Sequence, residues 1–197
     1  MLIHGVTSSL AVWFARVMPE LSRKFRVTAY DLRGHGYSDP TPTGYSSRAM
    51  ADDLLALLDH LGIERARLVG HSFGGSIALH TALLHPERVD GIVLADTGVA
   101  CLRYLRTIQD WPGWEIYKDR IAKYGITYAW FVEAEAGDVR NVIRKSYDMI
   151  QPYGARKGAL VGTPRLKKLI EETNIAAEFR EVAGMTEELL AKIAAPV

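Results

Sequence analysis

Short apolar runs alternate with segments of helical periodicity through the first half of the chain. The apolar runs have the length of strands or strand stubs and lie at residues 2–3, 25–30, 66–69 and 91–95. Leucine and methionine recur at spacings of three and four over residues 46–61, which predicts a helix that Gly62 ends. A second helix is expected from about residue 73 to 85, before Pro86. This alternation predicts an α/β fold with a partial, doubly wound, mostly parallel sheet covered on both faces.

The pattern changes after residue 96. Residues 97–187 show no convincing strand, only helix-length segments interrupted by glycine and proline, with many aromatic residues. We therefore expect a core over 1–96, a helical cap over 97–187 and a return to the core over 188–197. Some of the aromatic residues would form the core of the cap, and others would line an apolar substrate pocket. The pocket candidates are His71, Trp111, Trp114, Trp130 and Phe131.

Composition narrows the class of protein. The 197 residues include 24 Lys and Arg and 23 Asp and Glu, so a net charge of +1 indicates no surface for nucleic acid or an anionic membrane. The single cysteine, Cys101, excludes an internal disulfide, and no apolar run has the length of a membrane span. We expect a cytoplasmic protein that acts on a small molecule without a metal or cofactor.

One serine occupies a position that suits a catalytic nucleophile. In LVGHSFGGSIALH, residues 68–80, Ser72 lies between Gly70 and Gly74, after a predicted strand and before a predicted helix. A nucleophile elbow requires this setting, because its strained turn tolerates only small residues two positions away. The dipole of the following helix would also favour negative charge on the attacked substrate oxygen. The alternative is a glycine-rich turn with an inert serine.

Three stretches together resemble the α/β-hydrolase fold family. They are LIHGVTSSLAVW at 2–13, YDLRGHGYSD at 30–39 and LVGHSFGGSIALHTALLHPERVDGIVLADTG at 68–98. The resemblance implies that Ser72 is the nucleophile and that the backbone N–H groups of Val6 and Phe73 form the oxyanion hole. His4 and His35 belong to turn motifs of the family, so we expect both to be structural. The final IAAPV would approach another core strand.

The identity of residue 72 narrows the reaction that the resemblance implies. Haloalkane dehalogenases and epoxide hydrolases of this fold have an aspartate at this position, whereas a serine attacks an acyl carbon. The expected activity is carboxylesterase-like hydrolysis of an ester, lactone, thioester or C–C ketone bond in a small apolar substrate. A cofactor-free haloperoxidase-like activity is a side possibility.

The sequence departs from the family in its general base. The family order is serine, acid, histidine, but only His80 and His85 follow Ser72. At about 1.5 Å per residue, His80 would lie roughly 12 Å along the helix that begins at the turn. Asp96, after the strand at 91–95, is the best acid candidate, although in this family the acid more often follows a later strand. We expect a fragment with poor activity of its own; the alternative is a non-catalytic relative that binds a ligand.

Overall fold

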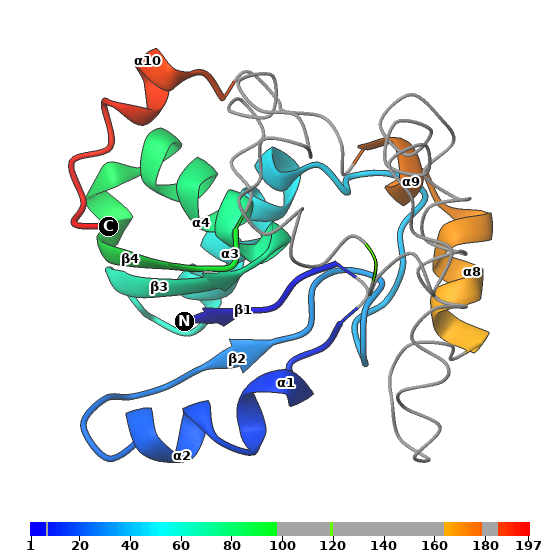
Figure 1. Ribbon diagram of the computed structural model, residues 1–197, viewed down its shortest axis with the longest axis horizontal. Helices are drawn as coiled ribbons and strands as arrows, with labels where there is room; N and C mark the ends of the chain where they lie inside the picture. The colour runs from blue at the N-terminus through cyan, green and yellow to red at the C-terminus, as the bar shows by residue number, and fades with distance from the viewer. Residues whose placement is uncertain (7, 98–118, 120–163, 179–184) are drawn as a thin grey trace.

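The computed structural model describes residues 1–6, 8–97, 119, 164–178 and 185–197 (Figure 1). The predicted cap lies mostly outside the described residues. The elements follow in the order β1 (Leu2–Ile3), α1 (Ala11–Phe14), α2 (Val17–Leu21), β2 (Ala29–Tyr30), α3 (Ser47–His60), β3 (Ala66–His71), α4 (Phe73–Leu84), the 3₁₀ helix η1 (Pro86–Arg88), β4 (Val89–Ala95), α8 (Pro164–Glu172), α9 (Ile175–Glu178) and α10 (Glu187–Leu190).

The described strands form one parallel sheet in the order β2-β1-β3-β4. The chain winds outward from β1 to β2 on one side, and through β3 to β4 on the other. The switch in winding direction therefore falls between β1 and β3. In open α/β sheets, ligands bind at such a switch point, outside the carboxyl ends of the strands. The predicted fold class is confirmed, and the carboxyl end of β3 lies at this switch point.

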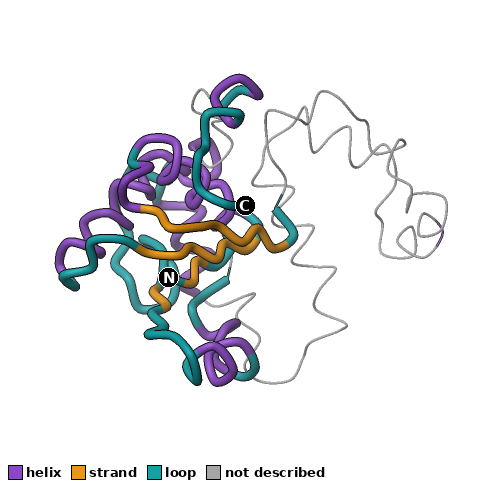
Figure 2. The backbone as a smooth tube through the Cα atoms, turned by 90° about the vertical axis from the view of Figure 1, so that its left-hand side faces the viewer, coloured by secondary structure: helices purple, strands orange, loops and turns teal. Residues whose placement is uncertain are grey.

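Helices lie on both sides of this sheet (Figure 2). The helices α3 and α4 pack on one face, and they bury Ile3, Leu68 and Ile92 in the main apolar core. The short helices α1 and α2, which the sequence pattern did not predict, lie beside β2 (Figure 1). No helix in the described part of the chain has the length and apolar character needed to cross a membrane.

The face opposite α3 and α4 is only partly covered by the described residues. A groove of about 770 Å³ runs along it, lined by side chains that include Leu21, Phe25, Val69 and Val93. Val93, in the middle of β4, is 57% exposed. Among the described residues, α1 and α2 are the helices on this side, and they lie beside β2.

Helix α3 shows how the local sequence sets an element. The Ser46 side chain accepts a hydrogen bond from the Ala49 N–H at 3.2 Å and so caps the helix. The helix buries Met50, Leu54 and Leu58, which recur at four-residue intervals. Gly62, at φ +63°, follows the helix with a backbone conformation that glycine adopts at low cost.

The last residues of the chain lie beside β4, on the edge that does not pair with β3. The Pro196 carbonyl accepts a hydrogen bond from the Ile92 N–H at 2.7 Å. Leu190 and Ile193, in and just after α10, pack against the main core. These contacts hold Leu190, Ile193 and Pro196 against the core and β4.

Candidate functional site

The turn between β3 and α4 consists of Ser72 alone, because β3 ends at His71 and α4 begins at Phe73. Ser72 has φ 52° and ψ −120°, a backbone conformation that side chains disfavour. Its N–H donates a hydrogen bond to the Ala95 carbonyl at 3.0 Å, so pairing between β3 and β4 extends to the turn. A strained serine held between a strand and a helix has the geometry of a nucleophile elbow.

Glycine is required on both sides of Ser72 by close backbone contacts. A Cβ atom on Gly70 would lie 2.4 Å from the Gly74 carbonyl oxygen, and one on Gly74 would lie 2.3 Å from the Ile3 carbonyl oxygen. Backbone atoms cannot move away as a flexible side chain can. These two glycines therefore let α4 start directly against the ends of β3 and β1.

Two further glycines of the site were not identified from the sequence. A Cβ atom on Gly75 would lie 2.1 Å from the Thr97 hydroxyl oxygen, so Gly75 makes room for the chain that leaves β4. A Cβ atom on Gly5 would lie 3.0 Å from the Ser72 Cβ. The sequence features that could have identified these two positions were the Gly-Gly pair at 74–75 and the glycine after His4.

The predicted oxyanion-hole residues lie on the two segments that meet at Ser72. Val6 follows Gly5, which lies against the Ser72 side chain, and Phe73 is the first residue of α4. Both side chains are partly buried and pack against the main core. The structure thus brings together the two segments whose N–H groups were predicted to bind the oxyanion.

His4 has a structural environment. Its Nε2 accepts a hydrogen bond from the Leu32 N–H at 3.0 Å, and its Nδ1 lies 2.7 Å from the Gly5 carbonyl oxygen. Burial lowers the pKa of His4 to about 4, so the ring is neutral near pH 7. With both nitrogens engaged, His4 joins β1 to the loop after β2.

His35 also fits the structural role expected for it. Its ring lies 5.4 Å from that of His4, and its Nδ1 lies 2.9 Å from the Arg33 carbonyl oxygen. Burial lowers its pKa as well. Beside the two rings, the Asp31 carboxylate accepts hydrogen bonds from the Leu10 N–H at 2.7 Å and the Tyr37 N–H at 3.0 Å. Asp31, whose role was not predicted from the sequence, thus holds the loops around the site.

Of the residues predicted to line the substrate pocket, His71 is the one that lies within the described residues. Its Nδ1 lies 3.3 Å from the position that a Cβ on Gly5 would take, next to Ser72. Its ring meets the buried Trp13 edge-on, with the centroids 6.5 Å apart. Trp13, on α1, was not identified from the sequence. The other pocket candidates, namely Trp111, Trp114, Trp130 and Phe131, lie outside the described residues.

Asp96 lies at the carboxyl end of β4, directly after the residue that pairs with Ser72. Its side chain is exposed, and its φ is +49°. Ser72 and Asp96 are the non-glycine residues with positive φ within the described residues. The two predicted catalytic residues are therefore strained positions at neighbouring strand ends, an arrangement more common at functional sites than elsewhere.

All six histidines of the chain lie in the described residues. Beyond Ser72, the His80 ring is buried on α4 with Nδ1 3.3 Å from the Ser76 carbonyl oxygen, and His85 follows the last residue of α4. Within the described residues, no hydrogen bond joins a histidine ring to Ser72. The described residues thus supply the turn, the glycines and the segments for an oxyanion hole, but no histidine hydrogen-bonded to Ser72.

Comparisons with known proteins agree with this architecture. The sequence profile described as "alpha/beta hydrolase fold" matches residues 1–147. The chain is 46% identical over 97 residues to a 2-hydroxymuconate semialdehyde hydrolase of Pseudomonas sp. strain CF600, which covers 48% of this chain and 34% of that protein. It is 42% identical over 101 residues to a fluoroacetate dehalogenase of Burkholderia sp., covering 49% and 33%. The chain therefore spans about a third of the length of these relatives.

Solved structures resemble the chain over nearly all its length. The α/β-hydrolase MGS-M2, from a deep-sea metagenome library of the Medee basin, is 25% identical with a TM-score of 0.60, covering 98% of this chain and 67% of that one. A hydrolase from Pseudomonas aeruginosa PA01 is 26% identical with a TM-score of 0.51, covering 98% and 62%.

Proposed function

Because the chain belongs to the α/β-hydrolase fold family, we propose that it is the part of a serine hydrolase that carries the nucleophile, Ser72. The substrate is a small apolar molecule with an ester, lactone, thioester or C–C ketone bond. The reaction proceeds through an acyl-enzyme on the Ser72 hydroxyl oxygen, which water then hydrolyses.

The backbone of Ser72 is the observation that carries this proposal. Its φ of 52° and ψ of −120° are costly for a residue with a side chain. Ser72 also lies at the switch point of the sheet and at the start of α4, whose dipole favours negative charge near its first residues. A turn without a catalytic role could have glycine at position 72, and it would not need to lie at the switch point of the sheet.

The serine favours acyl transfer over the other reactions of related proteins. The curated relatives include a soluble epoxide hydrolase, a fluoroacetate dehalogenase and a 2-(acetamidomethylene)succinate hydrolase, so similarity alone selects no bond type. A serine hydroxyl attacks an acyl carbon and leaves an ester that water can cleave. Residue 72 is therefore the feature that supports the choice among these chemistries.

The neighbouring groups have complementary roles in the proposed reaction. The N–H groups of Val6 and Phe73 would donate to the oxyanion that forms when Ser72 attacks, which typically contributes several kcal/mol to lowering the barrier. Asp96 is the proposed acid that orients the general base. The Gly5 position keeps the space beside the Ser72 side chain open.

A fluorophosphonate probe tests the assignment of the nucleophile. We expect mass spectrometry to locate the label on Ser72, with none in the Ser72→Ala variant. Ser76→Ala is the matched control, because it removes a serine one turn further along α4 and should leave labelling unchanged. Labelling that persists in Ser72→Ala would contradict the proposal.

Turnover by the 197 residues alone tests the need for a base. With no histidine bonded to Ser72, we expect p-nitrophenyl ester hydrolysis only on the order of 10³–10⁴-fold above the uncatalysed rate, the level that remains in enzymes without a triad. Turnover of several per second that disappears in Ser72→Ala would place the base within these residues.

The second candidate is a non-catalytic protein that keeps the scaffold and binds a ligand. The lack of a histidine hydrogen bond to Ser72 in the described residues is the observation that favours it. Folded wild-type protein that binds small esters but never takes up the fluorophosphonate label would support this function instead of hydrolysis.

A further inference from the structure

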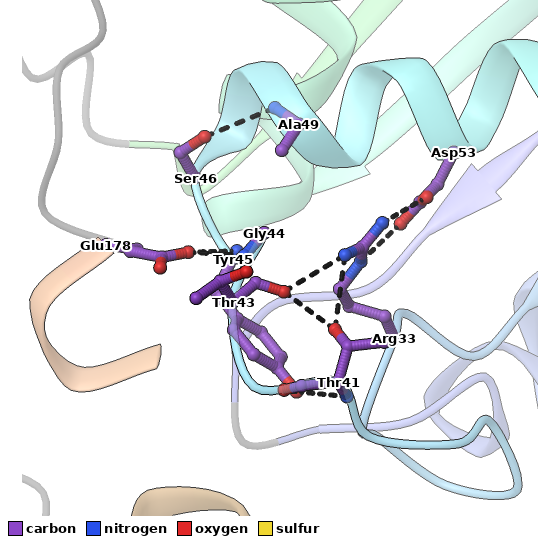
Figure 3. Close-up of polar contacts among 9 residues, drawn as sticks. All are labelled: Arg33, Thr41, Thr43, Gly44, Tyr45, Ser46, Ala49, Asp53 and Glu178. Carbon is purple, nitrogen blue, oxygen red and sulfur yellow. Dashed lines mark hydrogen bonds and ion pairs between the residues drawn. The ribbon is translucent and has the colours of Figure 1, made fainter. Parts of the chain in front are cut away.

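Residues 41–45 form a closed loop just before α3 (Figure 3). The Tyr45 hydroxyl donates a hydrogen bond to the Thr41 carbonyl at 2.8 Å and accepts one from the Thr41 N–H at 3.0 Å. The Tyr45 side chain is completely buried. These contacts fix the shape of the loop, so the N–H groups within it have set directions.

A partly buried cation, the Arg33 guanidinium, supports one side of the loop. Arg33 bonds the Asp53 carboxylate through two nitrogens, with Nε 2.7 Å from Oδ2, and its Nη1 donates to the Thr43 carbonyl at 3.1 Å (Figure 3). The hydrogen bond to Asp53 raises the pKa of Arg33 above its usual value, so the guanidinium stays charged. The ion pair thus joins the loop to α3 and places positive charge beside it.

A carboxylate occupies the other side of the loop. The Glu178 Oε2 accepts hydrogen bonds from the Gly44 N–H and the Tyr45 N–H, each at 2.6 Å. Gly44 has φ +94°, and a Cβ atom there would lie 2.1 Å from the Arg33 Nη1. Two successive N–H groups that converge on one oxygen, next to a guanidinium, form a binding site of the kind that takes anions.

The segment that carries Glu178 also contacts the core through apolar side chains. The Asn174 N–H donates to the Pro42 carbonyl at 2.9 Å, one helical turn before Glu178. Leu169 and Ile175 are each 2% exposed and belong to the main core. The segment therefore contacts the apolar core as well as the loop.

We propose that loop 41–45 is a carboxylate-binding site, and that Glu178 fills it as a latch that aligns segment 164–178 with the core. The ligand class follows from the donors, because two N–H groups beside a cation suit a planar, singly charged carboxylate. This site is separate from Ser72 and does not depend on the proposed function. When Glu178 is replaced, the loop should bind a small free carboxylate such as formate.

Amide hydrogen exchange of the 197-residue chain, resolved by NMR, tests the latch. In Glu178→Ala we expect the Gly44 and Tyr45 amides to exchange on the order of tenfold faster, since both lose their acceptor. Sodium formate should slow this exchange again, and sodium chloride at the same ionic strength should not. Unchanged exchange in Glu178→Ala, or equal effects of the two salts, would overturn the proposal.

Two further variants separate the latch from a general loss of charge or fold. Glu172→Ala removes the same charge from an exposed position of the same segment, paired with Lys168, and should leave exchange at Gly44 and Tyr45 unchanged. Glu178→Gln keeps a neutral acceptor and should give an intermediate rate. If Glu178→Ala does not fold, the glutamine variant carries the test, and wild-type exchange in it would overturn the proposal.

Discussion

The two faces of the sheet differ in how completely the described residues cover them. On one face, Leu68 and Ile92 lie under α3 and α4 and are 0% and 4% exposed. On the other face, the neighbouring residue Val93 is 57% exposed above an apolar groove. Alternation along a strand assigns side chains to faces. Whether a face is buried depends on segments elsewhere in the chain. The apolar run at 92–95 places apolar side chains on both faces of the sheet, but by itself it does not show that both faces are buried.

The largest expected loss of stability comes from Gly74, where α4 meets β1 on the covered face. Gly74→Val would put side-chain atoms against the Ile3 and His4 carbonyl oxygens, which the backbone fixes in place. We expect the free energy of unfolding in urea to fall by about 3 kcal/mol or more. Gly91→Ala is the control, because a Cβ atom there makes only ordinary contact at 3.5 Å. Equal stability of the two variants would contradict the close approach of α4 to β1 at Gly74.

Leu68 tests the covered face itself. Leu68→Ala removes a fully buried side chain between the sheet and the helices, and should lower the free energy of unfolding by about 3 kcal/mol. The measurement is a urea titration followed by circular dichroism. A loss below about 1 kcal/mol would mean that the helices can collapse into the space or do not pack there.

The pH dependence of stability tests the end of the sheet, where His4 is buried. Its pKa is about 4 in the folded chain and 6.5 in the unfolded chain, so the unfolded state binds more protons between these values. Stability should therefore fall as the pH drops through this window, by about 2 kcal/mol between pH 7.5 and pH 5. His4→Gln should flatten this part of the urea-stability profile. An unchanged profile would show that His4 is not the group that titrates.

Val93 should show the smallest effect. Val93→Thr keeps the shape of an exposed, β-branched side chain, so we expect a change in unfolding free energy within about 0.5 kcal/mol. If Val93→Thr costs as much as Leu68→Ala in the same titration, the groove is covered in solution, and the two faces are equivalent.

The elbow shows how much of a site local sequence can predict. The order of strand, Gly70, Ser72, Gly74 and helix predicted a strained turn. In the structure, Ser72 has a φ of 52°. Such a turn depends on residues within a few positions of each other, so its pattern is visible in the chain. Gly5 was missed because the atoms that crowd it belong to His71 and Ser72. Gly75 was missed because Thr97 crowds it. Each of these contacts joins residues that are far apart in sequence.

The carboxylate site on loop 41–45 could not be predicted from the sequence. Glu178 lies more than 130 residues from the amides that it bonds, within a stretch that shows only helical periodicity. Nothing in its neighbours distinguishes it from the other glutamates of the segment. Only the fold brings Gly44, Arg33 and Glu178 together.

The sequence by itself determined the alternation of strands and helices, the turn at Ser72 and its glycines, because periodicity, capping and backbone strain act over a few residues. The tertiary structure alone decided which face of the sheet the described helices α3 and α4 cover, which nitrogens of His4 are bonded and which carboxylate the 41–45 loop binds. Each of these depends on contacts between segments far apart in the chain. Their strength comes from burial and from the direction of the hydrogen-bonding groups, and a linear pattern records neither.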